Sequence, residues 1–219
     1  RITVIRLGET KGTYDAKDIT MDRLTELIIG SKLEDSYDEF KHPVENPELI
    51  LDVKDLHYSE HGVTKVDKVN FSIRGGEILG VAGVQGNGQE QLIKAITGLI
   101  PFQDGTVKLA GTEIQGMNIA QKRDAGMAYI PEDRMIDGSA PAASIQDNLI
   151  STCYEQPKYS GKIFLKQSVI REESQELIDR FSIKTQSEKE KVSALSGGNI
   201  QKVIVAREFS TGPDIIIAN

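Results

Sequence analysis

The sequence predicts a mixed α/β fold with a helical segment in its second half. Strand-like apolar runs alternate with helical patterns after about residue 47, residues 144–210 read mainly as helix, and the apolar run DIIIA follows. Alternation of strands and helices is typical of α/β architecture. A chain of 219 residues with 38% hydrophobic and 27% charged residues can build one or two domains with a sizeable core.

The N-terminal part, residues 1–34, predicts a small unit of its own. RITVIRLGETKGTYDA alternates apolar and polar residues as a hairpin does, and DITMDRLTELIIG then reads as a short helix with a threonine cap and a glycine end. Residues 35–47 are polar, acidic and proline-containing, which indicates a linker. The main domain is therefore expected over 48–219.

The main domain reads as two hairpins, a buried strand and several helices. The apolar run GGEILGVAG predicts the buried strand, because a short apolar run bounded by glycines is typical of one. The remaining elements, in order, are the strand pair LILDVKDLHY and VDKVNFSI, the helix QEQLIKAITGL, the hairpin DGTVKLAGTEI, the strand MAYIPEDR, and the helices SIQDNLIS, KQSVIREESQELIDRF and GNIQKVIVAREFS. Both ends of the chain lie in strand-like runs, so we expect a piece of a longer protein.

Composition argues against several functional classes. The net charge of −7 and pI of about 5.1 disfavour nucleic acid or an anionic membrane surface as partner. A single cysteine, Cys153, excludes a disulfide framework within the chain and fits a reducing compartment. No apolar run reaches the roughly 18 residues that span a bilayer.

The stretch GVQGNGQEQ, which begins at Gly83, has the glycine spacing of a phosphate-binding loop between a strand and a helix. A working loop also carries a lysine for the β- and γ-phosphates and a hydroxyl for Mg²⁺, where this chain has Gln89 and Glu90. Loss of the lysine is expected to weaken nucleotide binding about ten- to a hundredfold. Glu90 either repels phosphate or holds Mg²⁺ weakly, and a plain glycine turn remains the alternative. The expected nucleotide-binding residues here are Gly83, Gly86, Asn87, Gly88, Gln89 and Glu90.

A second candidate anion site lies in ALSGGNIQKVIVARE, residues 194–208. Small residues lead directly into a helical pattern, so a hydroxyl and unobstructed backbone N–H groups meet at a helix start. A serine cap alone would explain the serine but not the two glycines after it. The expected site residues are Ser196, Gly197, Gly198, Asn199 and Gln201.

This second stretch resembles the LSGG signature of the ATP-binding-cassette (ABC) ATPases, and the order of the other motifs agrees with that family. The resemblance places Tyr58 where an aromatic ring stacks on adenine, and YIPEDR at the glutamine loop, with Glu132 in place of glutamine. TGPDIIIAN resembles the start of the Walker B strand, with Asn219 where an aspartate is expected. It implies an ABC-type P-loop ATPase domain, with a mixed sheet core, an antiparallel β subdomain and a helical subdomain, that stops at the Walker B strand.

GVAGVQGNGQ, PEDR and LSGGNIQK more closely resemble the second nucleotide-binding half of double-cassette subunits in bacterial sugar and nucleoside importers. Residues 1–34 then resemble the tail of the first cassette. In such pairs each ATP lies between the phosphate loop of one cassette and the signature of the other. The resemblance implies ATP and Mg²⁺ as cofactors, weak or absent at this half's own site, and no catalytic residue in this piece alone, so the isolated chain is expected to be inactive.

The same resemblance implies the partners and the location. These are the first cassette of the same subunit, a membrane permease and, indirectly, a solute-binding protein, at the cytoplasmic face of the membrane, with no nucleic acid. The apolar face of SIQDNLI (Ile145, Leu149, Ile150) either docks a permease helix or belongs to the core of the helical subdomain. The alternative function is a non-catalytic nucleotide-binding or dimerisation module of a soluble ABC protein.

Overall fold

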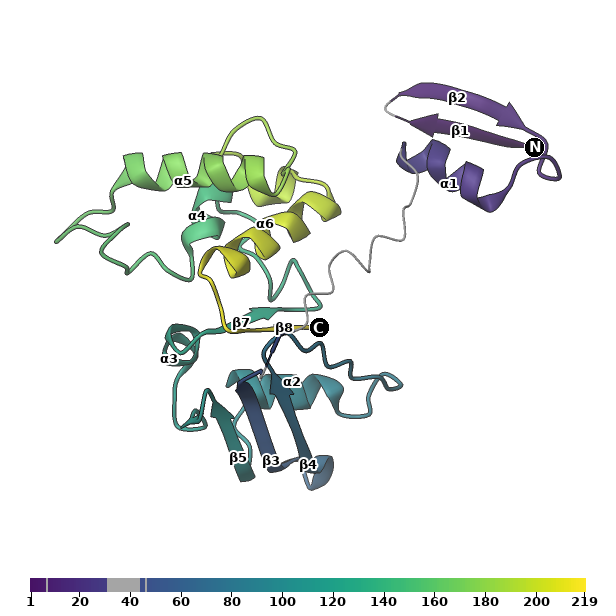
Figure 1. The fold of residues 1–219 in the computed structure, drawn as a ribbon. Helices are drawn as coiled ribbons and strands as arrows, with labels where there is room; N and C mark the ends of the chain where they lie inside the picture. The colour runs from purple at the N-terminus through teal and green to yellow at the C-terminus, as the bar shows by residue number, and fades with distance from the viewer. Residues whose placement is uncertain (7, 31–43, 46) are drawn as a thin grey trace. The chain divides into compact units, whose positions relative to one another are not determined.

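The computed structural model of the chain describes residues 1–6, 8–30, 44–45 and 47–219. The chain divides into two compact units at Glu45 and Asn46 (Figure 1). The predicted linker lies almost entirely outside the described residues. Among the described helices, none combines the length and apolar character that crossing a bilayer requires.

The first unit is a hairpin with one helix against it. Strand β1 (Ile2–Arg6) pairs antiparallel with β2 (Glu9–Tyr14), and helix α1 (Met21–Ile29) packs on β1. The hydroxyl of Thr20 accepts the N–H of Arg23 at the start of α1, and Gly30 ends the helix with a left-handed φ of 91°. The predicted hairpin and helix are confirmed.

The second unit opens with an antiparallel sheet in the order β4-β3-β5-β6. The long hairpin of β3 (Leu49–Glu60) and β4 (Val63–Arg74) supplies half of it, and β5 (Asp104–Leu109) with the short β6 (Thr112–Glu113) completes it. These are the two hairpins that the alternating sequence predicts.

Four more elements pack against this sheet or extend the core. Helix α2 (Gln89–Thr97) contacts β3 and β4, helix α3 (Ile119–Asp124) contacts β7 (Met127–Ile130), and β7 pairs in parallel with β8 (Ile215–Ala218). One hydrophobic cluster joins the sheet, α2, β7 and β8. The pairing of β7 with β8 joins residues that are 88 positions apart in the sequence, such as Met127 and Ile215, so the helices between the two strands form an insertion.

That insertion folds as a helical layer of its own (Figure 1). It contains α4 (Ile145–Ile150), α5 (Gln167–Arg180), a 3₁₀ turn (Val192–Ala194) and α6 (Gly197–Ser210). The apolar face of α4 lies inside this layer, since its three side chains, Ile145, Leu149 and Ile150, are at most 6% exposed. These side chains are core, and the docking interpretation of that face is wrong, because a partner cannot reach residues that α5 and α6 already cover.

The predicted buried strand GGEILGVAG is also wrong. Residues 77–84 form no strand, and the side chains of Ile78 and Val84 are 97% and 74% exposed. An apolar run becomes a buried strand only where a neighbouring strand pairs with its backbone, and the described strand ladders do not include this run. Its glycines weaken the strand further, since glycine loses more backbone freedom on ordering and has no side chain to pack.

Replacement of Leu149 by alanine tests the helical core. Leu149 is 1% exposed, so Leu149→Ala is expected to lower the free energy of unfolding by about 2–5 kcal/mol through lost burial and a residual cavity. Val63→Ala at the exposed β3–β4 turn is the matched control and should change it by less than about 0.5 kcal/mol. Urea denaturation followed by circular dichroism measures both, and equal effects would contradict this assignment of the core.

Candidate functional site

The loop at 83–88 leads directly into α2. Gly86 and Gly88 take left-handed φ angles of 91° and 97°, and Gly88 is the residue that caps the helix. A side chain at Gly88 would collide with the backbone carbonyl oxygen of Lys65 on β4, so glycine is required there by packing as well as by conformation. Asn87 closes the turn with its N–H on the carbonyl of Val84 at 3.2 Å. The predicted glycine turn is therefore present.

The side chain of Gln89 folds back into this loop. Its amide Nε2 donates to the carbonyl oxygen of Val84 at 3.4 Å and fills the space that a Cβ at Gly83 would need. The Gln89 amide is neutral, and it forms a hydrogen bond with a carbonyl of the loop itself. A working loop has a lysine at this position, whose positive charge faces phosphate. The side chain of Gln89 thus helps to hold the loop in this conformation.

Glu90 is engaged by Lys94 one turn further along α2. The Lys94 ammonium donates to Oε1 of Glu90 at 2.6 Å, and this hydrogen bond raises the pKa of Lys94. The described residues contain no group of three or more His, Cys, Asp or Glu side chains that is arranged to hold a metal ion. A Mg²⁺ role for Glu90 therefore fits poorly, because its carboxylate already pairs with a cation.

A cavity of about 690 Å³ gathers three of the predicted positions from distant parts of the sequence. Glu90 from α2, Glu132 after β7 and Asn219 after β8 all line it. Asn219 donates its N–H to the carbonyl of Ile130 at 3.0 Å. The cavity is lined by four acidic and two basic side chains: Glu90, Glu132, Asp133 and Asp137, and Lys94 and Arg134.

The lining of this cavity carries an excess of two negative charges, which is unfavourable for a polyanion. Gln89 and Asn219 stand where the resemblance expects a lysine and an aspartate for phosphate and Mg²⁺. Asp133 shapes the wall, since its carboxylate accepts the N–H groups of Met135 and Ile136 at 2.8 and 2.9 Å, which lowers the pKa of Asp133.

Tyr58 lies away from open space. It is 9% exposed, opposes Val66 across the β3–β4 hairpin and belongs to the sheet's hydrophobic cluster. A ring that stacks on adenine needs an open face, so the burial of Tyr58 in this arrangement argues against the predicted stacking role, and equally against an exposed tyrosine at the end of a strand.

The predicted signature residues form the first turn of α6. Ser196 is the residue before the helix, and its side chain does not cap the backbone; its hydroxyl instead accepts a hydrogen bond from the Asn199 amide at 3.0 Å. The Asn199 amide oxygen accepts the N–H of Lys184 at 2.9 Å, which fixes this side chain. Ser196, Gly198 and Gln201 are exposed, and the space beside Gly198 is open. The turn thus presents backbone N–H groups and a hydroxyl to solvent, which fits an anionic ligand.

Arg134 is a residue at this turn that sequence reasoning missed. A Cβ at Gly197 would lie 2.7 Å from its Nη2, so the guanidinium covers the glycine. The only signal in the sequence was its place in PEDR, which does not reveal a contact with a helix about sixty residues away.

A buried ion cluster, also missed, joins α6 to β7 and α3. The Glu208 carboxylate is fully buried. It accepts hydrogen bonds from two guanidinium nitrogens of Arg123 at 2.7 and 3.1 Å, from Nε of Arg207 at 2.8 Å and from the N–H of Tyr129 at 3.3 Å. Such a carboxylate is stable only when it is paired and hydrogen-bonded. Four donors meet that requirement.

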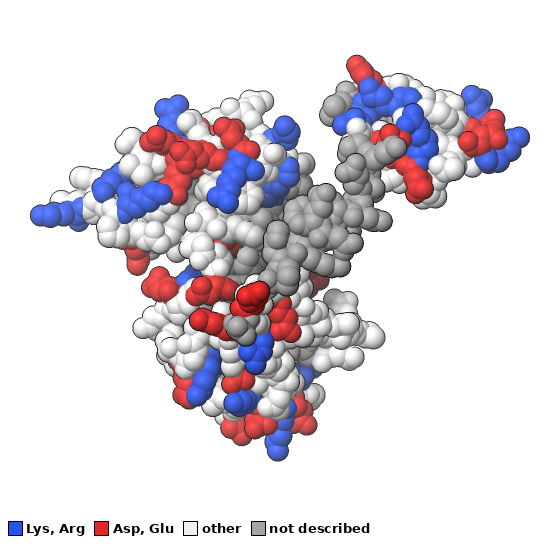
Figure 2. Space-filling model, in the orientation of Figure 1, with Lys and Arg blue, Asp and Glu red and all other residues white. Residues whose placement is uncertain are grey.

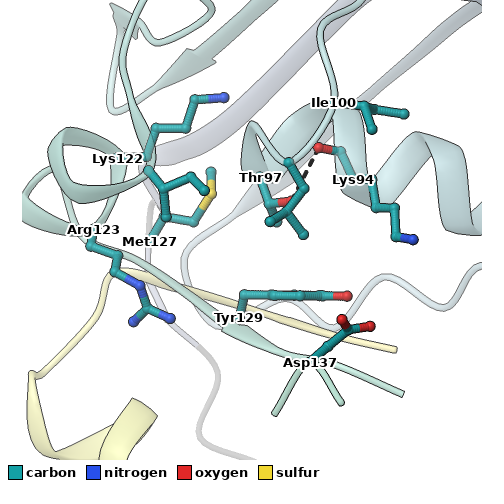
Figure 3. A pocket seen from close by; sticks show the side chains of 10 residues that line it. Lys94, Thr97, Ile100, Lys122, Arg123, Met127, Tyr129 and Asp137 are labelled. Carbon is teal, nitrogen blue, oxygen red and sulfur yellow. Dashed lines mark hydrogen bonds between the residues drawn. The ribbon is translucent and has the colours of Figure 1, made fainter. Parts of the chain in front are cut away.

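A second cavity, of about 380 Å³, shares Lys94, Tyr129 and Asp137 with the first and is lined by residues of α2 and α3 (Figure 3). Lys122 and Arg123 border one side of it, and Lys94 and Asp137 lie on the other. Lys122 is 2% exposed and donates its ammonium to the carbonyl of Ile96 at 2.9 Å. Burial lowers the pKa of Lys122 below its ordinary value of 10.5.

A pH titration of stability tests this buried ammonium. The folded chain releases the Lys122 proton at lower pH than the unfolded chain does, so stability rises with pH between the folded-state pKa and 10.5. Lys122→Met removes this rise, and Lys108→Met, at an exposed position on β5, retains it. Unfolding by urea at a series of alkaline pH values measures the difference. Identical pH profiles for the wild type and Lys122→Met would contradict the assignment.

Comparisons with known proteins agree with this arrangement. The sequence profile described as ABC transporter matches residues 66–219. The chain is 36% identical over 220 residues to the nucleoside import ATP-binding protein NupA of Lactococcus lactis, and 33% identical over 220 residues to the ribose import ATP-binding protein RbsA of Clostridium perfringens. The matches cover 100% and 99% of this chain but 43% and 42% of those proteins, so the chain spans about two fifths of the length of these relatives.

A solved structure supports the fold. A nucleotide-free ATP-binding cassette from an ABC transporter superposes with a TM-score of 0.63 at 20% identity, over 78% of this chain and 68% of that one. The strand and helix layers described above are thus those of an ABC ATPase cassette. With the profile match over residues 66–219, the chain belongs to the ABC transporter family.

Proposed function

We propose that this chain is the second nucleotide-binding half of the ATP-binding subunit of an importer for nucleosides or simple sugars. The relatives named above carry out nucleoside and ribose import, which supports this class of solute. In the proposed subunit residues 1–34 are the tail of the first cassette. The partners are that cassette, a membrane permease at the cytoplasmic face of the membrane and, indirectly, a solute-binding protein.

One observation carries the mechanism: the chain offers two unequal half-sites. Ser196 and Gly198 of the signature turn are exposed, and the turn presents N–H groups and a hydroxyl, whereas the phosphate loop is filled by its own Gln89 amide. Phosphoryl transfer depends on positioned positive charge around the γ-phosphate. The signature turn therefore completes an ATP site on the partner cassette, and the chain's own site contributes little to hydrolysis.

At the partner's site the first turn of α6 holds and orients the γ-phosphate of ATP. Its backbone N–H groups and the Ser196 hydroxyl donate hydrogen bonds, and the positive end of the helix dipole adds to them. The Asn199 amide, which donates to the Ser196 oxygen, leaves the hydroxyl proton available for phosphate. ATP with Mg²⁺ supplies the phosphoryl group when it is bound.

A second candidate is a non-catalytic dimerisation module. The Gln89 amide in the phosphate loop favours it, since this half by itself lacks the groups for hydrolysis. ATP-dependent dimerisation without any hydrolysis in the complete subunit would select this candidate. Co-purification with a membrane permease and coupled hydrolysis would select the importer.

Substitutions in the two half-sites are expected to have unequal effects. In the complete subunit, Ser196→Ala combined with Gly197→Ala should lower single-turnover ATP hydrolysis about a hundredfold, because it removes a hydroxyl donor and displaces Arg134 from the turn. Ser193→Ala, at an exposed serine just before the signature, is the matched control. Gln89→Ala should change the rate less than about twofold. Comparable losses from the two half-sites would refute the asymmetry.

Replacement of Gln89 by lysine is expected to restore affinity for ATP in this half. Gln89→Lys should tighten binding of ATP to the chain about ten- to a hundredfold, because a charged hydrogen-bond donor then faces the phosphates. Gln91→Lys adds the same charge to α2 outside the loop and should have little effect. Isothermal titration calorimetry measures both. Equal gains would mean that net charge, and not the loop, limits binding.

A further inference from the structure

The loop between α4 and α5 projects from the helical layer and exposes two large apolar side chains (Figure 1). Ile163 and Phe164 are 83% and 81% exposed, and they are adjacent in the sequence. We call residues 158–166 (KYSGKIFLK) the tip loop. Single exposed apolar residues are ordinary on protein surfaces, but two such neighbours at a projecting point indicate a contact site.

The backbone of the tip loop is held in place. The N–H of Gly161 donates to the carbonyl of Phe164 at 2.8 Å, the N–H of Lys166 donates to the carbonyl of Tyr159 at 2.7 Å, and Ser160 forms a bridge with Leu165. These bonds close the loop on itself. The two apolar side chains are therefore presented by an ordered turn.

Tyr159 anchors the tip loop to the helical layer. It is 5% exposed, packs in a cluster with Ile150, Cys153 and Ile170, and donates its hydroxyl to Oε1 of Glu173 at 2.7 Å. The base of the loop is thus fixed in a core, so the exposed apolar pair cannot turn inward without breaking this anchor.

Positive charge surrounds the apolar pair. Residues 156–171 contain Lys158, Lys162, Lys166 and Arg171 and no acidic residue. Glu173 pairs with Lys158 at 2.5 Å, and Glu188 pairs with Arg171 at 3.3 Å. The Lys166 ammonium donates to the carbonyl of Pro157 at 2.8 Å, and neither Lys162 nor Lys166 has an acidic partner among the described ion pairs. Cationic side chains lie at the end of this projection in Figure 2.

We propose that the tip loop inserts Ile163 and Phe164 into the interface of a bilayer that contains anionic lipid, with Lys162 and Lys166 at the headgroups. Apolar side chains enter the acyl boundary, and lysines extend their stems while the ammonium groups stay near lipid phosphates. The net charge of −7 does not prevent this contact, because charges farther than about 8–10 Å are screened at physiological salt. Net charge alone disfavours contact with an anionic membrane surface, but the local charge of the tip loop favours it.

A protein partner fits this feature less well. Two side chains at a point offer far less than the roughly 800 Å² per partner of a stable protein interface. The proposal goes beyond the importer function, since the contact needs neither nucleotide nor permease. The two ideas therefore fail separately: vesicle binding tests only the tip loop, and ATP hydrolysis tests only the half-sites.

A tryptophan probe tests insertion directly, since the chain contains no tryptophan. In the full chain, Phe164→Trp should show an emission shift to shorter wavelength, and quenching by brominated acyl chains, on addition of phosphatidylglycerol–phosphatidylcholine vesicles. Val63→Trp at the β3–β4 turn, 56% exposed, is the matched control and should show neither. Vesicles of phosphatidylcholine alone should give a much weaker signal. Unchanged Phe164→Trp emission with both vesicle types would overturn the proposal.

Vesicle sedimentation separates the apolar from the charged contribution. Ile163→Ser combined with Phe164→Ser should lower the partition coefficient at least tenfold, and Lys162→Glu should lower it at least about fivefold. Lys189→Glu, an exposed lysine elsewhere in the helical layer, should leave binding unchanged. These positions are exposed, so thermal unfolding should match the wild type in every variant. A photocrosslinker at 164 that labels a protein and no lipid in native membranes would also overturn the proposal.

Discussion

The Glu208 carboxylate is the interaction on which the arrangement of the second unit depends. It lies where α6, α3 and β7 meet, and it binds two guanidinium groups and a backbone N–H. Removing one partner of a buried pair typically costs about 3–5 kcal/mol, because the other charge is then left unpaired. The cluster thereby ties α6, which carries the signature turn, to β7. Because the chain continues from β7 to Arg134, the cluster also helps to place Arg134 against Gly197.

The two half-sites differ in whether their own side chains occupy the space beside the helix start. Both place glycines at a helix start, which is the local requirement for an anion site. In the phosphate loop one carbonyl is satisfied by the Gln89 amide, and the neighbouring cavity is acidic. In the signature turn the polar side chains bind one another at the base and leave the first turn open. The sites also differ in backbone, because Gly88 is left-handed before α2 whereas Ser196 is extended before α6.

Most of the fold could be predicted from the sequence, because its hairpins and helices follow local patterns. The antiparallel hairpins and α5 with α6 match the predicted elements, and the signature serine and glycines lie at a helix start as expected. The apolar run after Gly76 could not be predicted correctly, since its burial depends on a neighbouring strand that local sequence does not reveal. Long-range pairs such as Arg123 with Glu208, 85 residues apart, leave no periodic trace in a single sequence.

The collision that any side chain at Gly88 would make with the carbonyl of Lys65 bears on how such motifs are interpreted. That glycine is constrained by the neighbouring strand whether or not a ligand ever binds. Glycine at this position is therefore needed for packing as well as for any role in binding. A motif search that weighs glycines detects the backbone turn, and the charged side chains must be assessed separately.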